Sequence, residues 1–265
     1  MVARIAAALA GACLLLFGGG AVAGEKDRYD PNVVSGDWIG PADILFIGDS
    51  EGLGYFGAQL YRAMAGEHDP RSGKALRVWS FWTCGSDAQS WLVGATSYCG
   101  IRTCNSAGSC ARDHGPDDRP GRVHYSALRY YLGKVAPRIT IVALGVNMLS
   151  LHDRAFHRSY DGYLEGVAAL AGQVRAAGSR CIWIGPPQVA LRTKSAEDYT
   201  RFSTDLGRAA KRAGCGYIDS NPLSDRRYVA PRDSEGIHYQ PTGEKAWQAN
   251  VWTVLRPILI GLLNS

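Results

Sequence analysis

A serine placed directly after a short apolar run is the first residue of this sequence whose setting suits chemistry. Residues 44–47 read Ile-Leu-Phe-Ile, and Gly48, Asp49 and Ser50 follow, with further glycines close behind. This pattern predicts a buried strand that runs through a tight turn into a helix. Because ligands bind at the carboxyl ends of the strands in open α/β sheets, we expect Ser50 at the rim of a cleft. A serine there is a nucleophile if a base and an oxyanion hole converge on it; otherwise Asp49 and Ser50 merely cap the helix.

Two later residues offer hydrogen bonds to the negatively charged oxygen that attack by a serine creates. Gly85 follows the predicted strand 75–83, and because it lacks a Cβ its backbone N–H can approach a substrate oxygen closely. Asn147 follows the apolar run 138–144, and its side-chain amide donates where an ionised aspartate would only accept. Together with the N–H of Ser50 these groups would form an oxyanion hole, although each residue is also a common turn former.

His238, in the loop before the predicted last helix, is the candidate base. From this position its imidazole can reach Ser50, and Glu235, three residues earlier, can fold back in a turn to hold the other ring nitrogen. Asp233 is an alternative orienting acid at a different spacing. The chain has six histidines, and a single surface histidine is usually inert. The support for catalysis therefore comes from the order Gly-Asp-Ser, a glycine after a strand, Gly-x-Asn and acid-x-x-His.

Runs of strand type alternate with runs of helix type along the chain. The predicted strands cover residues 44–47, 75–83, 138–144, 181–185 and 215–219, and the predicted helices cover 53–65, 126–136, 160–177, 196–213 and 242–262. Such alternation favours a mostly parallel sheet with helices on both faces. Residues 95–122 show no periodicity and are rich in Cys, Gly, Ser and Asp, so we expect a long surface loop tied by disulfides.

The composition and the first residues bound the domain organisation. With 265 residues, 46% hydrophobic and 20% charged, the chain suits one α/β domain better than two. Residues 1–23 have the basic start, apolar run and small-residue end of a signal peptide; a polar leader follows at 24–41, and the domain covers 42–265. No other stretch is apolar enough to span a membrane, so we expect a secreted or periplasmic protein without stable membrane insertion. The formal net charge of +5 is spread along the chain, and without a basic patch nucleic-acid binding is not expected.

Six cysteines remain once the segment that holds Cys13 is removed, which suits disulfides in an exported protein. Cys181 and Cys215 open two successive predicted strands, which often lie side by side, so we predict that they are bonded. The other four are Cys84, Cys99, Cys104 and Cys110. The sequence leaves their three possible pairings open. A zinc site of Cys99, Cys104, Cys110 and His114 would lack the short pair spacings of known sites, so no metal is predicted.

In its motifs the chain resembles the SGNH hydrolases, the GDSL-type esterase and lipase superfamily. The resemblance rests on Gly48-Asp49-Ser50, Gly85, Gly145-Val146-Asn147 and Glu235-Gly236-Ile237-His238, and it covers nearly all of residues 42–262. It implies a flavodoxin-like three-layer α/β/α sandwich with a mostly parallel sheet, and ester hydrolysis through an acyl-serine without a metal or cofactor. The site residues that it implies are Ser50 as nucleophile, His238 as general base, and Ser50, Gly85 and Asn147 as the oxyanion hole.

The chain departs from the pattern of this family at two places. The family usually has aspartate three residues before the histidine, where this chain has Glu235. Glutamate carries the same charge on a side chain one methylene longer, so we expect the role to survive. The segment between Gly85 and Gly145 is expanded by the cysteine-rich residues. Because insertions near strand ends commonly shape the substrate cleft, we expect this segment to set specificity.

These features predict an exported serine esterase that removes short acyl groups, acetyl first among them, from a small-molecule, carbohydrate or cell-envelope ester. Trp82, Trp91 and Tyr98 lie near the expected rim and could stack on sugar rings, but aromatic residues in such positions are more often part of the core. The alternative is an O-acyltransferase, in which a glycan hydroxyl takes the acyl group from the same serine, and the motifs do not separate the two. A lipid esterase is less favoured because no long exposed apolar stretch offers to hold an acyl chain. A non-catalytic carbohydrate-binding protein is disfavoured by the intact site motifs.

Overall fold

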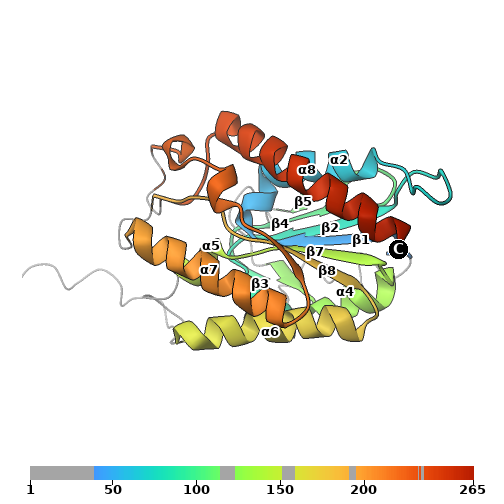
Figure 1. The fold of residues 1–265 in the computed structure, drawn as a ribbon, viewed down its shortest axis with the longest axis horizontal. Helices are drawn as coiled ribbons and strands as arrows, with labels where there is room; N and C mark the ends of the chain where they lie inside the picture. Colours follow the sequence, from blue (N-terminus) through green and yellow to red (C-terminus); the bar gives the residue numbers. More distant parts are fainter. Residues whose placement is uncertain (1–38, 114–122, 151–158, 191–194, 232, 234–235) are drawn as a thin grey trace, which may run out of the picture.

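The computed structural model describes residues 39–113, 123–150, 159–190, 195–231, 233 and 236–265 of the chain (Figure 1). The predicted signal peptide and nearly all of the predicted leader lie outside this part and stay predictions. None of the helices that the structure describes is both long and apolar enough to cross a bilayer.

Parallel strands form the centre of a seven-stranded sheet in the described part of the chain. They are β1 (Ile44–Gly48), β2 (Val78–Thr83), β7 (Ile139–Ala143), β8 (Arg180–Ile184) and β9 (Gly216–Ile218). Their order across the sheet is β2-β1-β7-β8-β9, so the direction in which strands are added reverses between β1 and β7. This is the flavodoxin-like order, in which ligands bind beyond the carboxyl ends of the strands at the point of reversal. The predicted fold class is confirmed.

Helices cover both faces of the sheet, which gives the molecule three layers (Figure 1). One face packs against α2 (Tyr55–Ala65) and α8 (Pro241–Asn264), and the other against α3 (Ala88–Val93), α4 (Leu128–Val135), α6 (Tyr160–Ala176) and α7 (Ala196–Arg212). Short turns of helix include η1 (Ser50–Leu53), α5 (Val146–Ser150), η4 (Asn221–Leu223) and η5 (Arg226–Tyr228). Alternate side chains of β1 enter the two cores, so the strand is apolar on both faces and reads as a continuous apolar run.

Trp82 of β2 fills the space beside the turn that follows β1. Its side chain is 1% exposed and packs edge-on against Phe46, with 4.2 Å between ring centroids. A Cβ atom added to Gly48 would lie 2.0 Å from this indole, and one added to Gly52 would lie 1.5 Å from it. Glycine at both positions therefore leaves the room that the indole occupies. Of the two places that the sequence left open for Trp82, the rim and the core, the structure shows the core, because the glycine-rich turn packs over the indole.

Replacing Gly52 with alanine is expected to destabilise the protein strongly. The new Cβ would overlap the enclosed Trp82 ring, so the turn or the ring has to move, and overpacking of this kind costs about 1–3 kcal/mol or more. We expect urea unfolding to show a loss of at least about 2 kcal/mol. Gly172→Ala is the matched control, since its added Cβ meets no atom within 4 Å in helix α6, and it should be neutral or stabilising. Equal stability of the two variants would contradict the close approach at Gly52.

The cysteine-rich segment forms strands where the sequence predicted a loop. β4 (Ile101–Cys104) pairs antiparallel with β2, and β5 (Cys110–Asp113) pairs with β4, so both extend the main sheet. β3 (Ala95–Ser97) pairs with β6 (Val123–Tyr125) in a separate two-stranded sheet. Strands of three or four residues are too short to show an alternating pattern, which is why the prediction of a surface loop is wrong for residues 95–113, although the predicted disulfides are present there. Residues 114–122 lie outside the described part.

The described residues contain three disulfides, Cys84–Cys99, Cys104–Cys110 and Cys181–Cys215. The predicted Cys181–Cys215 bond is confirmed, and its Cα atoms lie 4.5 Å apart where β8 and β9 begin. The other two bonds resolve the pairings that the sequence left open. Cys104–Cys110 links the paired strands β4 and β5, whereas Cys84–Cys99 joins the end of β2 to the loop that precedes β4.

Candidate active site

Ser50 lies at the carboxyl end of β1, next to the point where the strand order reverses. The Asp49 carboxylate accepts the N–H of Glu51 at 3.2 Å and so caps the short turn that Ser50 begins. Ser86 Oγ, beyond the end of β2, donates to the carbonyl oxygen of Gly48 at 3.1 Å and joins the two strand ends. Capping is therefore done by Asp49, and the hydroxyl of Ser50 is left for another role.

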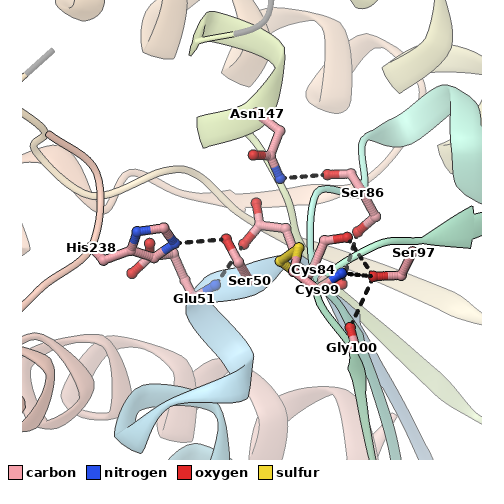
Figure 2. The surroundings of a disulfide bond; sticks show 11 residues. Ser50, Glu51, Cys84, Ser86, Ser97, Cys99, Gly100, Asn147 and His238 are labelled. Carbon is pink, nitrogen blue, oxygen red and sulfur yellow. Dashed lines mark hydrogen bonds between the residues drawn. A yellow bond between two sulfur atoms is a disulfide. The ribbon is translucent and has the colours of Figure 1, made fainter. Parts of the chain in front are cut away.

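His238 faces Ser50 from a loop that closes on itself. An isolated bridge joins Val229 to Tyr239, and the N–H of Ala230 donates to the carbonyl oxygen of His238 at 2.7 Å. This closure places His238 Nε2 3.3 Å from Ser50 Oγ (Figure 2). The histidine side chain is 46% exposed, so a substrate can reach it. The distance suits a base whose hydrogen bond to the hydroxyl tightens when substrate binds.

The carboxylate that the structure places at the other ring nitrogen belongs to Asp233. Its Oδ2 lies 3.3 Å from His238 Nδ1 and accepts the backbone N–H groups of Ile237 and His238, each at 2.6 Å. These bonds fold the loop back, and Gly236 allows the fold with a φ of 75°. Glu235, the predicted orienting acid, lies outside the described residues, so its role stays a prediction. The alternative acid, Asp233, is the one that the structure brings to the histidine.

Gly85 and Asn147 follow the two strands that flank β1 in the sheet. Gly85 has a φ of 75°, and its N–H has no acceptor within the part of the chain that the structure describes. Asn147 is 7% exposed, and its Nδ2 donates to the carbonyl oxygen of Ser86 at 2.9 Å, which ties the ends of β2 and β7 together (Figure 2). The three predicted oxyanion donors therefore come from three adjacent strand ends.

Two further carboxyl groups near Ser50 escaped the sequence analysis. Glu51 is 5% exposed, and within the described residues its Oε1 has no hydrogen-bond partner. Burial raises the pKa of Glu51 well above its usual range, and the nearby carboxylates of Asp49, Glu244 and Asp233 raise it further. Glu244 of α8 accepts the backbone N–H groups at the start of α2. For Glu51 the available signal was its position between the candidate nucleophile Ser50 and the residues Gly52 and Leu53.

The stability of the protein is expected to fall as pH rises through the range in which Asp49 ionises. Burial raises the pKa of Asp49 from 3.8 to about 7, against the opposing effect of hydrogen bonds from the N–H groups of Glu51 and Gly145. Between these values the folded state binds more protons than the unfolded state, so stability is lost with rising pH and levels off above about pH 7. From pH 5 to pH 8 this amounts to about 2–3 kcal/mol.

Asp49→Asn tests this dependence because the amide oxygen can still cap the turn but does not ionise. We expect the unfolding free energy of the variant, measured in urea at pH 5 and pH 8, to fall less than that of the parent. The variant should also be the more stable protein at pH 8. The same fall in both proteins would show that Asp49 is not the titrating group.

Comparison with solved structures places this fold among lipases and esterases. The esterase EstA of Pseudoalteromonas superposes with a TM-score of 0.52 at 11% identity, covering 82% of this chain and 97% of that one. A lipase/acylhydrolase from Enterococcus faecalis gives 0.51 at 13%, with coverage of 81% and 95%. An α/β hydrolase from the metagenome of Lake Arreo gives 0.51 at 13%, with coverage of 85% and 98%. This chain shares the fold of these lipases and esterases.

No protein-family model matches the sequence, and no curated protein does so either. At identities this low the shared property is the fold, and the activity has to be argued from the residues at the strand ends.

Proposed function

We propose that this protein is a serine esterase that removes short acyl groups, acetyl first among them, from a carbohydrate or cell-envelope ester outside the cytoplasm. The observation that carries the proposal is the line Asp233–His238–Ser50, with 3.3 Å between each pair of facing atoms, at the carboxyl end of β1. A nucleophile, a base and an orienting acid in this order are what acyl transfer by serine requires. Because these three residues lie on a fold that this chain shares with esterases, they support ester hydrolysis as the reaction.

The reaction has two steps. As Ser50 Oγ attacks the ester carbonyl, His238 Nε2 takes the hydroxyl proton, and the N–H groups of Ser50 and Gly85 with the amide of Asn147 hold the negative oxygen. The C–O bond to the alcohol then breaks, and His238 returns the proton to the leaving oxygen. Water attacks the acyl-serine in the second step with His238 again as base, which releases the acid and restores Ser50.

Tyr98 supports a carbohydrate substrate. Its side chain is 61% exposed beside Cys99, which the disulfide holds close to the end of β2. An exposed aromatic face next to a hydrolytic site is suited to stacking on a sugar ring. Trp91, for which the sequence left both the rim and the core open, is buried and donates its indole N–H to Ser86 Oγ at 3.1 Å, so it supports the site from below.

The disulfides support export, because bonds of this kind persist in oxidising compartments. They also favour the secreted or periplasmic location that the predicted signal peptide implies. Neither location requires contact with nucleic acid or insertion into a membrane.

Hydrolysis of p-nitrophenyl acetate, butyrate and octanoate by the mature protein tests the proposal. We expect the acetate to be cleaved fastest and the rate to fall with chain length, after which acetylated polysaccharides are compared. A rate that rises with chain length would favour a lipid esterase. The phosphonate inhibition recorded for the Pseudoalteromonas esterase makes a fluorophosphonate a suitable probe for the serine of this chain.

A sugar hydroxyl in place of water would make the same site an O-acyltransferase, since the exposed face of His238 is open to either acceptor. Slow hydrolysis that a carbohydrate acceptor diverts into an acylated sugar would favour this second function. Product analysis with and without the acceptor separates the two outcomes.

A further inference from the structure

The Cys84–Cys99 disulfide lies immediately beside a candidate oxyanion donor. Cys84 directly precedes Gly85 at the end of β2, and Cys99 stands just before β4. Figure 2 shows this bond in the same neighbourhood as Ser50, His238 and Asn147. By contrast, the Cys181–Cys215 bond lies where β8 and β9 begin, at the opposite end of the sheet.

A hydroxyl group strengthens this connection. Ser97 is 2% exposed, and its Oγ lies 3.0 Å from the carbonyl oxygens of both Cys84 and Gly100, which share its hydrogen (Figure 2). The N–H of Cys84 donates to the carbonyl oxygen of Gly100 at 3.0 Å, and the N–H of Cys99 donates to Ser97 Oγ at 3.4 Å. Cys84 is therefore held through its side chain, its N–H and its carbonyl.

The carbonyl of Cys84 and the N–H of Gly85 belong to one peptide group. Because a trans peptide is planar, its C=O and N–H point in opposite directions, and fixing one fixes the other. The Ser97 hydroxyl holds the oxygen, so it also sets the direction of the Gly85 N–H, which has no acceptor within the described residues. On the other side of Gly85, Ser86 is held by its bonds to Gly48 and Asn147.

Gly85 itself supplies no such restraint. A Cβ built at this position would meet no atom within 4 Å, so packing does not confine the turn, and glycine moves between positive and negative φ at little cost. The direction of its N–H therefore depends on the groups at either side. Loss of the hold on Cys84 would allow this peptide to rotate and turn the donor away from the substrate oxygen.

We propose that the Cys84–Cys99 disulfide and Ser97 are positioning residues of the oxyanion hole: they orient the peptide group whose N–H is the Gly85 donor. This inference rests on the proposed acyl-serine chemistry. It assigns a role in transition-state stabilisation to one disulfide and to one buried hydroxyl that do not touch the substrate. The Cys181–Cys215 bond, at the far end of the sheet, contributes to stability alone.

The test compares Cys84→Ala/Cys99→Ala with the matched control Cys181→Ala/Cys215→Ala, each made as the full mature protein. One readout is the split between kcat and KM for p-nitrophenyl acetate. The other is the second-order rate at which a fluorophosphonate labels Ser50: the Oγ–P bond forms, fluoride leaves, His238 takes the proton, and the phosphoryl oxygen occupies the oxyanion hole. Labelling does not depend on turnover of an ester.

We expect the Cys84/Cys99 variant to lose about 10- to 100-fold in kcat and in labelling rate, with KM within about twofold, since removal of one oxyanion donor costs about 100- to 1,000-fold. The control should keep both rates within about twofold although it melts at a lower temperature. Ser97→Ala, which keeps the disulfide, is the second variant and should lose about 3- to 30-fold in both rates, as a misdirected donor predicts. If the cysteine variant does not fold, Ser97→Ala decides the question.

Equal rates in the parent and in the folded variants would overturn the positioning role, and so would equal losses in the control. Failure of the proposed function looks different. If the parent cleaves no ester but its Ser50 is labelled, hydrolysis is refuted and the labelling rates still decide this inference. A parent whose Ser50 is not labelled at all refutes both.

Discussion

Ser50→Ala is expected to reduce ester hydrolysis by about 10⁴- to 10⁶-fold, the range seen when the nucleophile of a serine hydrolase is removed. The acyl-serine cannot form without Oγ, and the oxyanion donors alone leave only a small residual rate. The fold should survive, because within the described structure the Ser50 hydroxyl hydrogen-bonds to His238 alone and the cap of the turn is Asp49. The measurement is kcat/KM for p-nitrophenyl acetate, with the melting temperature determined on the same samples.

Ser106→Ala serves as the matched control, since Ser106 lies in an exposed turn between β4 and β5 and should leave the rate unchanged. Fluorophosphonate labelling gives a second check, because the parent should gain one phosphonyl group that the Ser50 variant lacks. Retention of more than about a hundredth of the parental rate in the Ser50 variant would point to a different nucleophile and refute the proposed mechanism.

The sequence predicted the sheet and its carboxyl edge because these depend on local patterns. The runs at 44–47 and 139–144 place apolar residues on both faces, as strands covered by helices on both sides must, and each is followed by glycine. The candidate donors and the nucleophile follow these strands directly. Their convergence needs only the parallel arrangement of the strands and the order that brings β1 and β7 together.

The aromatic residues show where local patterns fail. The sequence left both the rim and the core open for Trp82 and Tyr98, and the structure encloses the first under the glycine-rich turn and exposes the second. The register of β2 determines the face on which Trp82 lies. Whether that face is open depends on the turn after β1, which comes much earlier in the chain. The short strands β4 and β5 of the cysteine-rich segment form because β4 pairs with β2 and β5 pairs with β4. The sequence of each strand alone does not predict this pairing.

The orienting acid depends on loop geometry, which a spacing rule does not capture. The spacing favours Glu235, which lies outside the described residues and stays a prediction, whereas the described part of the loop brings Asp233, five positions before the histidine, to the imidazole. Asp233 reaches the imidazole because its carboxylate first accepts two backbone N–H groups of the same loop, and a positive φ at Gly236 turns the chain. In the sequence these two features appear only as an aspartate and a glycine in a polar stretch, which does not predict the shape of the loop.

Asp233→Asn is therefore expected to lower kcat by about 10²- to 10⁴-fold with little change in stability. The carboxylate at Nδ1 favours the tautomer in which Nδ1 carries the hydrogen and Nε2 is free to accept the Ser50 proton. An amide oxygen in the same place can still accept the hydrogen of Nδ1, but it carries no negative charge to stabilise the imidazolium that forms when His238 takes the Ser50 proton. The loop should remain folded, because the amide oxygen can still accept the N–H groups of Ile237 and His238.

Glu235→Gln made alongside decides between the two acids. If Asp233 orients the histidine, the Glu235 variant keeps its kcat within about threefold, and the Asp233 variant loses at least about a hundredfold at an unchanged melting temperature. The reverse result would restore the acid that the family spacing predicts. Asp233→Ala tests in addition how much the carboxylate stabilises the loop. It removes the acceptor of two backbone N–H groups as well as the orienting charge, so it should also lower the melting temperature. A loss of rate in Asp233→Ala without one in Asp233→Asn would mean that the carboxylate shapes the loop and does not act on the imidazole.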